Sequence, residues 1–230
     1  MKFNDTVSKC MAECIGTFFL IFFGCGSIIL FEINPNNAGP FIPVIWGTVV
    51  SVVIYTLGHV SGAHINPAVT VAFWAAKKFP GKKVPGYIAS QILGAALASY
   101  SHLLIWGSSH QFGGTHLAVS VPGGFLIEVL LSFFLMFVVM GTAIDSRASQ
   151  DLAGVAIGAT VALAAFVGGP LTGASMNPAR SIGPALLSGN DANLWLYIVA
   201  PILGTVLGAK VYGGIRAAPE TPEEPPLDPS

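Results

Sequence analysis

Apolar residues along the chain gather into six long runs that are separated by short polar stretches. A helix needs about 20 apolar residues to cross a bilayer. The six runs are close to this length and cover residues 10–31, 41–59, 84–106, 123–144, 152–167 and 194–213. The pattern predicts an all-α membrane protein with six transmembrane helices joined by short connections.

Two further apolar segments, residues 66–76 and 177–187, are too short to span a bilayer. Each begins with Asn-Pro, which places a preferred N-cap residue before the proline that suits the first turn of a helix. We therefore expect two re-entrant half-helices that start inside the protein.

The chain contains an internal repeat. Residues 61–68 (SGAHINPA) match residues 172–179 (TGASMNPA), and Glu13 in the first span matches Glu128 in the fourth. Each copy holds three spans and one half-helix. Because three is an odd number, the second copy must be inverted relative to the first, and such repeats place a transport site near the midplane. We expect a single transmembrane domain over residues 1–216, with repeats at about 8–113 and 114–214.

Composition and charge agree with the pattern. Hydrophobic residues make up 53% of the chain and charged residues 9%, whereas a soluble domain carries about 25% charged residues. The net charge of −1 does not favour nucleic-acid binding. With a cytoplasmic N-terminus, every Lys and Arg except Arg180 falls at a cytoplasmic end or loop, as the positive-inside rule requires. We expect a multi-pass protein of the cell membrane with both termini cytoplasmic and a disordered, acidic, Pro-rich tail at 217–230.

The sequence offers no catalytic or metal-binding set. Cys10, Cys14 and Cys25 stand near the first span without a His or acidic cluster to complete a metal site, and their odd number argues against a disulfide framework. There is no G-x-S-x-G or H-E-x-x-H motif. We expect neither an enzyme nor a bound metal or cofactor.

Physical chemistry suggests a role for the two Asn-Pro-Ala triplets. The N-terminus of a helix carries about +0.5 elementary charge, so two such ends aimed at one point repel cations, including hydronium. The amides of Asn66 and Asn177 can donate hydrogen bonds to the oxygen of a passing water molecule or hydroxyl group. An oxygen held by two donors must present its lone pairs to them, and this orientation interrupts the chain of hydrogen bonds along which protons would move. Each asparagine taken alone is also an ordinary N-cap.

Arg180 is the one basic residue whose position the positive-inside rule does not explain. A charge in the middle of a membrane costs roughly 2.5–3.5 kcal/mol or more, so it should face water or a partner. Two interpretations remain open from the residues alone: a salt bridge with Glu13 or Glu128, or a hydrogen-bond donor that lines a pore.

The two motifs SGAHINPAVT and GASMNPARS resemble those of the major intrinsic protein family, the aquaporins and glycerol facilitators, and the resemblance covers about residues 8–214. It implies a channel domain, a pore in each subunit, a homotetramer in the lipid bilayer, and passage of water and small neutral solutes. The pore motifs would be Asn66, Pro67, Ala68, Asn177, Pro178 and Ala179.

By the same resemblance, an aromatic/arginine filter would consist of Trp46, Ala165, Ala174 and Arg180. Trp46 could instead be an interfacial anchor that faces lipid, and the alanines could serve packing. The assignment of Ala165 to the filter assumes that the alignment with the family has no gap within residues 166–172. Water-selective members carry histidine in span five, so alanine there implies a wider aperture that suits glycerol-like polyols, urea or neutral metalloid hydroxides. These four filter residues resemble those of the nodulin-26-like branch of the family. The chain departs from the glycerol facilitators in one respect, because Ser181 stands where they tend to have Asp.

Glu13 and Glu128 also have two interpretations. A transporter would use them for proton coupling, whereas the family uses such glutamates to accept hydrogen bonds from the re-entrant loops. The resemblance favours this supporting role, with His64 beneath the first half-helix and His59 in the cytoplasmic vestibule. The sequence thus predicts a passive channel that excludes ions and protons, with a water-selective channel or an ion-coupled secondary transporter as alternatives.

Overall fold

The computed structural model describes residues 4–36, 39–108 and 111–216. Within these ranges the chain forms eight α-helices and several short helical turns, and no strand is assigned. The α-helices are α1 (Asp5–Ile33), α2 (Ile42–Ser61), α3 (Pro67–Ala75), α4 (Val84–Trp106), α5 (Val121–Val139), α6 (Ala153–Thr172), α7 (Pro178–Ser188) and α8 (Leu194–Ile215).

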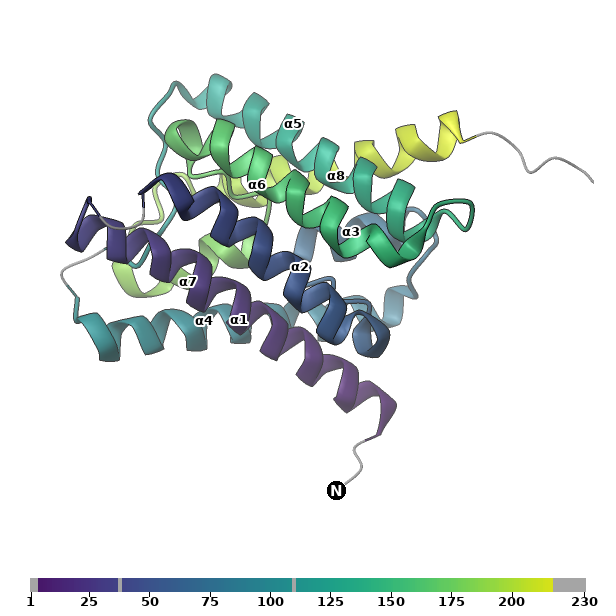
Figure 1. Ribbon diagram of the computed structural model, residues 1–230, viewed down its shortest axis with the longest axis horizontal. Helices are drawn as coiled ribbons and strands as arrows, with labels where there is room; N and C mark the ends of the chain where they lie inside the picture. The colour runs from purple at the N-terminus through teal and green to yellow at the C-terminus, as the bar shows by residue number, and fades with distance from the viewer. Residues whose placement is uncertain (1–3, 37–38, 109–110, 217–230) are drawn as a thin grey trace, which may run out of the picture.

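Six of these helices, with the short turns that adjoin some of them, are long and apolar enough to cross a membrane, as predicted. They lie side by side in a bundle, and α1 begins at the same end of the bundle at which α8 ends (Figure 1). The short helices α3 and α7 lie toward opposite ends (Figure 1). The prediction of an all-α membrane protein is confirmed.

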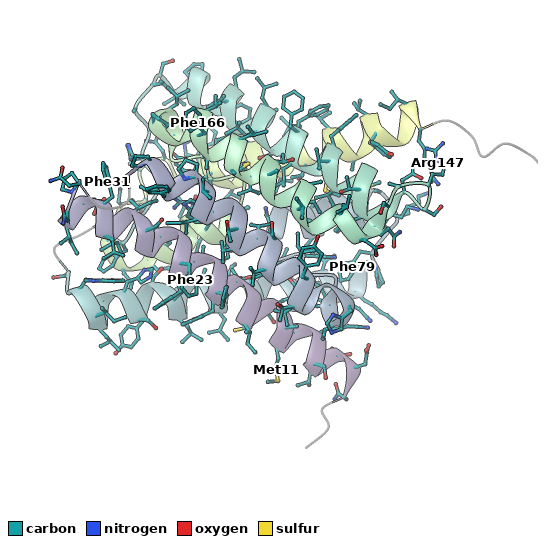
Figure 2. All side chains as sticks on the ribbon, in the orientation of Figure 1. Met11, Phe23, Phe31, Phe79, Arg147 and Phe166 are labelled. Atoms are coloured by element: carbon teal, nitrogen blue, oxygen red, sulfur yellow. The ribbon has the colours of Figure 1, made fainter. Side chains whose placement is uncertain are left out.

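The outside of the bundle is apolar. Phe23 and Phe166 point away from it (Figure 2), and 71% of the Phe166 side chain is exposed. In water such a surface would be unstable, but acyl chains solvate it without cost. The charged ends and the apolar sides therefore both match a protein that is embedded in lipid.

Most observed boundaries lie within a few residues of the predicted ones, and two ends of helices show why they shift. Helix α1 begins at Asp5 because the side chain of Asn4 caps it, accepting a hydrogen bond from the Val7 N–H at 2.9 Å. Helix α6 continues through Pro170 to Thr172, beyond the predicted end at residue 167. The Gly-Gly-Pro sequence there is typical of a break, but the helix tolerates it. The expected disordered tail at 217–230 lies outside the described residues.

The two halves have the same plan. In the first half α1 packs on α4, and in the second α5 packs on α8. A glycine permits the close approach at each crossing: a Cβ on Gly94 would collide with the Cys14 carbonyl oxygen, and one on Gly204 with that of Val129. The halves are joined by α2 against α6, by α3 against α8 and by α7 against α4.

Helix α5 ends in a turn of π-helix, Met140–Ile144, which is followed by the buried residue Asp145. Such turns are rare and often occur at functional sites. Here the turn brings Ile144 to the wall of an internal cavity and directs Asp145 toward α8.

Candidate functional site

The two loops that precede α3 and α7 have the same backbone conformation. Ala63 and Ile65 have φ values of 45° and 44°, and Ala174 and Met176 have φ values of 43° and 51°. Left-handed backbone is uncommon for residues other than glycine and costs of order 1–3 kcal/mol each. Four such residues at matching positions of the repeat indicate that the surrounding structure holds both loops in place.

The asparagines at the start of α3 and α7 meet between the loops. The side-chain amide of Asn66 donates to the Met176 carbonyl oxygen at 2.8 Å, and that of Asn177 donates to the Ile65 carbonyl oxygen at 2.8 Å. Each side-chain oxygen accepts from the first turn of its own helix. An amide has two N–H groups, so each asparagine keeps one donor for the adjacent cavity, which both residues line.

A fully buried carboxylate holds the first loop. Glu13 accepts hydrogen bonds from the backbone N–H groups of His64 and Ile65 at 2.9 and 2.7 Å, and from the Ser61 hydroxyl at 2.7 Å. The side chain of Gln91 donates a further bond at 2.7 Å. With four donors around it, this carboxylate is saturated.

Glu128 holds the second loop in the same way. It accepts from the N–H groups of Ser175 and Met176, each at 2.8 Å, and from the Thr172 hydroxyl at 2.7 Å. Because the loop N–H groups turn toward the two glutamates, the loop carbonyl groups are free to face the opposite side.

A pair of tyrosines supports the ends of α2 and α6. Tyr87 donates to the carbonyl oxygen of Ser61 at 2.8 Å, and Tyr197 donates to that of Thr172 at 2.9 Å. Neither these tyrosines nor Gln91 were predicted from the sequence. The tyrosines could have been found, since they share the repeat register of Gly94 and Gly204.

His64 lies beneath the first half-helix. Its Nδ1 is 3.1 Å from the Thr70 hydroxyl oxygen, and its ring packs against the rings of Phe73, Phe79 and Tyr87. This places the imidazole in the packing behind the loop, although part of it also reaches the cavity wall.

Arg180, in the first turn of α7, is almost completely buried. Its guanidinium group donates to the Gly113 carbonyl oxygen at 2.9 Å and, more weakly, to that of Gly173 at 3.5 Å. Within the described part of the chain it forms no salt bridge, so the salt-bridge interpretation with Glu13 or Glu128 finds no support.

Gly113 was also missed, because it acts through its backbone. Its φ is 63°, and a Cβ there would lie 2.6 Å from the carbonyl oxygen of Cys25. Only glycine fits this position, where the chain presses against α1 and offers its own carbonyl oxygen to Arg180.

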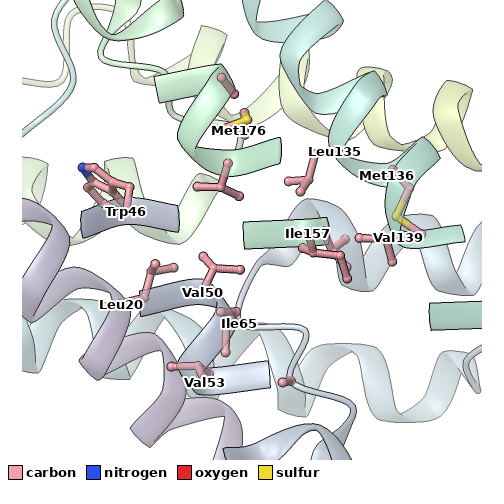
Figure 3. Close-up of a cluster of buried hydrophobic side chains, with 14 of the residues drawn as sticks. Leu20, Trp46, Val50, Val53, Ile65, Leu135, Met136, Val139, Ile157 and Met176 are labelled. Carbon is pink, nitrogen blue, oxygen red and sulfur yellow. The ribbon is translucent and has the colours of Figure 1, made fainter. Parts of the chain in front are cut away.

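A cavity of about 560 Å³ runs between the two halves. Apolar side chains from both halves face it, among them Leu20 and Val50 on one side and Leu135 and Ile157 on the other (Figure 3). The two loops and the asparagine pair also line this cavity. Its lining therefore combines apolar side chains with hydrogen-bonding groups.

Every residue expected in the filter or the vestibule lines this cavity, namely Trp46, His59, Ala165, Ala174 and Arg180. Trp46 is mostly buried, so it does not face lipid. His59 follows Trp46 by thirteen residues along α2, which is about 20 Å of helix. Trp46 and His59 therefore reach the cavity at points far apart along its length.

Comparison with known proteins agrees with this geometry. Residues 1–212 match the family model described as Major intrinsic protein. Nodulin-26 of Glycine max is 47% identical over 217 residues, covering 91% of this chain and 78% of that protein. Aquaporin NIP1-1 of Zea mays is 46% identical over 215 residues, covering 91% and 75%.

Among solved structures, the X-ray structure of the aquaglyceroporin from Plasmodium falciparum matches with a TM-score of 0.81 and 28% identity, covering 91% of this chain and 96% of that one. The sequence motifs, the fold and these matches lead to one conclusion: the chain belongs to the major intrinsic protein family.

Proposed function

We propose that the chain is a passive channel for water and small uncharged solutes and that it excludes ions and protons. The family and fold are those of membrane channels and not of enzymes. The observation that carries the proposal is the meeting of α3 and α7 at Asn66 and Asn177 in the wall of the cavity, with Arg180 farther along it. Two positive helix ends and one fixed cation oppose the entry of cations.

The residues near Arg180 support a broad range of solutes. Ala165 and Ala174 project one methyl group each, so the aperture there is set mainly by Trp46 and Arg180. An apolar ring beside a strong donor suits molecules with a carbon face and hydroxyl groups. We therefore propose glycerol-like polyols, urea and neutral metalloid hydroxides as solutes in addition to water, with a channel for water alone as the less favoured candidate.

The placement of the buried acids weighs against ion-coupled transport. Glu13 and Glu128 are fully buried, bound by loop N–H groups, and absent from the residues that line the cavity. A coupling site must exchange its ion with the passage. We propose that both glutamates support the re-entrant loops.

Assembly and orientation are proposed on other grounds. We propose a homotetramer on the strength of the family resemblance, to be tested by light scattering of the purified protein.

The positive-inside rule supports a cell-membrane protein with cytoplasmic termini, because Lys9, Lys78 and Arg147 are at or near one end of the bundle. Protease cleavage of terminal tags in sealed vesicles tests this orientation.

Stopped-flow light scattering of proteoliposomes tests the conduction. We expect permeability to water, glycerol, urea and boric acid above that of empty liposomes, without dependence on a proton or sodium gradient. Saturable flux that requires such a gradient would overturn the channel proposal. Water flux without any solute flux would replace the broad solute range by the water-selective alternative.

A further inference from the structure

A second pocket lies beside one end of the pore cavity. It has a volume of about 240 Å³ and is formed by the end of α8, the π-helical turn and the segment that follows α3. Part of its wall is apolar, with Ala76, Met140, Ile144, Ala209 and Gly213. Lys78, Asp145, Lys210, Tyr212 and Arg216 supply the polar groups.

The acid in this pocket is already satisfied. One Asp145 oxygen, Oδ2, lies 2.7 Å from Nη2 of Arg147 and 3.2 Å from Nε of Arg216, and it accepts from the Tyr212 hydroxyl at 2.9 Å. The other oxygen accepts from the Arg147 Nε at 3.0 Å. Two cations thus surround one carboxylate, which has little capacity left to neutralise another positive group.

The two lysines are different. Within the described ranges the ammonium groups of Lys78 and Lys210 form no hydrogen bond or ion pair, and both residues are exposed. Three basic residues and one acid line the pocket, and the acid is already paired with one of these basic residues, Arg216, and with Arg147 beside them. The pocket therefore carries an excess of positive charge that the described part of the protein does not balance.

The pocket lies at the ends of two candidate membrane spans, where lipid headgroups are expected. It sits where α8 and the α5 span end, and Figure 2 shows Arg147 at this end of the bundle. Tyrosine near the end of a span is typical of the membrane interface, and Tyr212 is three residues before the last residue of α8. Basic pockets between transmembrane helices at the cytoplasmic side are suited to lipid phosphates.

We propose that this pocket binds the headgroup of an anionic phospholipid, with Lys78 and Lys210 as the groups that contact the phosphate. A cationic rim over an apolar wall matches a molecule that carries a phosphate on a glycerol and acyl body. A free phosphate ion would gain nothing from the apolar wall, so the lining favours the lipid. Lys78 and Ile144 line both the pocket and the pore cavity, and a bound headgroup would thus lie beside the mouth of the passage.

Native mass spectrometry of the purified full-length chain tests the proposal without any reference to transport. The protein is titrated with phosphatidylglycerol and with phosphatidylcholine of the same acyl chains. We expect tighter binding of phosphatidylglycerol. In Lys210→Gln this binding should weaken about fivefold, the contribution of one basic residue near an anionic group. Lys210→Arg should retain it, and Lys78→Gln/Lys210→Gln should abolish the preference for the anionic lipid.

Lys82→Gln is the matched control, because Lys82 is an exposed lysine in the same connecting segment as Lys78 but does not line the pocket. An equal loss of binding in Lys82→Gln and Lys210→Gln would overturn the proposal, since it would reveal a diffuse charge effect. Equal affinity for the two lipids would overturn it as well. Displacement of phosphatidylglycerol by an equal concentration of inorganic phosphate would assign the pocket to the free ion instead of the lipid.

Discussion

The guanidinium group of Arg180 lies over the indole ring of Trp46, with its central carbon 5.0 Å from the ring centroid. The indole in turn rests on Gly24, where a Cβ would lie 2.6 Å from three of its ring carbons. The Gly113 carbonyl oxygen binds the guanidinium from another direction. The charge is therefore fixed in position at the wall of the cavity, although no acid of the described residues forms an ion pair with it.

Replacing Arg180 by alanine should admit protons or other cations. Removing one unit charge about 10 Å from a permeating cation lowers its barrier by roughly 1.5 kcal/mol at an effective dielectric constant of about 20, which is about tenfold in rate. A pH-sensitive dye inside proteoliposomes measures the proton flux. Water permeability should remain, because the cavity widens.

Arg180→Lys is the control for this change. It keeps the charge but loses the planar group that binds Gly113 and stacks on Trp46. We expect it to exclude cations nearly as well as the wild type. Unchanged proton exclusion in Arg180→Ala would contradict the role proposed for the charge.

Replacing Ala165 by histidine should narrow the aperture beside Trp46 and Ala174. We expect the glycerol permeability to fall by about tenfold, an added barrier of about 1.4 kcal/mol, and the water permeability to fall much less. Stopped-flow measurements on the same vesicles give both values. Ala165→Ser, which adds one oxygen atom, should leave both close to the wild type, whereas an equal loss of water and glycerol flux in Ala165→His would refute the filter assignment.

Replacing Glu128 by glutamine should destabilise the second loop. The amide offers one acceptor where two oxygens now accept from Ser175, Met176 and Thr172. Its NH₂ group would face a backbone donor, so we expect the free energy of unfolding to fall by about 1–3 kcal/mol. Denaturant unfolding in detergent measures this loss.

Ser132→Ala is the matched control on the same helix, because the buried Ser132 hydroxyl has no hydrogen-bond partner among the residues that the structure describes. Its removal should leave the stability unchanged or slightly higher. A transporter would behave in the opposite way: Glu128→Gln would keep its stability and lose a dependence on the proton gradient. That outcome would contradict the supporting role proposed for Glu128.

The sequence predicted the six spans and the two half-helices well, because each rests on a strong signal. Span length follows from bilayer thickness, and the Asn-Pro pairs mark helix starts in any context. The repeat also predicts that Asn66 and Asn177 meet, and their side-chain bonds to Met176 and Ile65 join the two loops.

The unpredicted parts of the candidate site depend on the backbone or on distant contacts. The Gly113 carbonyl oxygen carries no side-chain identity that a sequence could reveal. The positive φ of Ile65 and Met176 is disfavoured for these residue types and arises from the glutamates that hold the loops. The π-helical turn before Asp145 has no known sequence signal of comparable strength.

Asp145 should make the stability of the protein depend on pH in the acid range. The hydrogen bonds from Arg147, with that from Tyr212, hold the pKa of this carboxyl far below its ordinary value of 3.8. A group with a lowered pKa stabilises the folded state above the unfolded pKa and loses this effect as the pH falls toward the folded pKa. The stability difference between the wild type and Asp145→Asn should therefore be constant near neutrality and shrink below about pH 4.

Thermal unfolding in detergent between pH 3 and pH 7 measures this difference. Asp151→Asn is the control, because its side chain is exposed and forms no ion pair within the described residues. Its difference from the wild type should stay small at every pH. A stability difference for Asp145→Asn that grows on acidification would show that the ion pairs do not have this effect.

The close crossing of α5 and α8 predicts a strong contrast between two glycines of the same helix. A Cβ at Gly204 would collide with the backbone of Val129, which cannot move without separating the helices. We expect Gly204→Ala to lower the free energy of unfolding by about 1–3 kcal/mol, the usual cost of overpacking. Among the described residues, no atom lies within 4 Å of a Cβ at Gly214, so Gly214→Ala should raise the stability by up to about 1 kcal/mol through its higher helix propensity. Equal effects of the two substitutions, measured by unfolding in detergent, would show that the crossing has more freedom than the backbone contact at Gly204 implies.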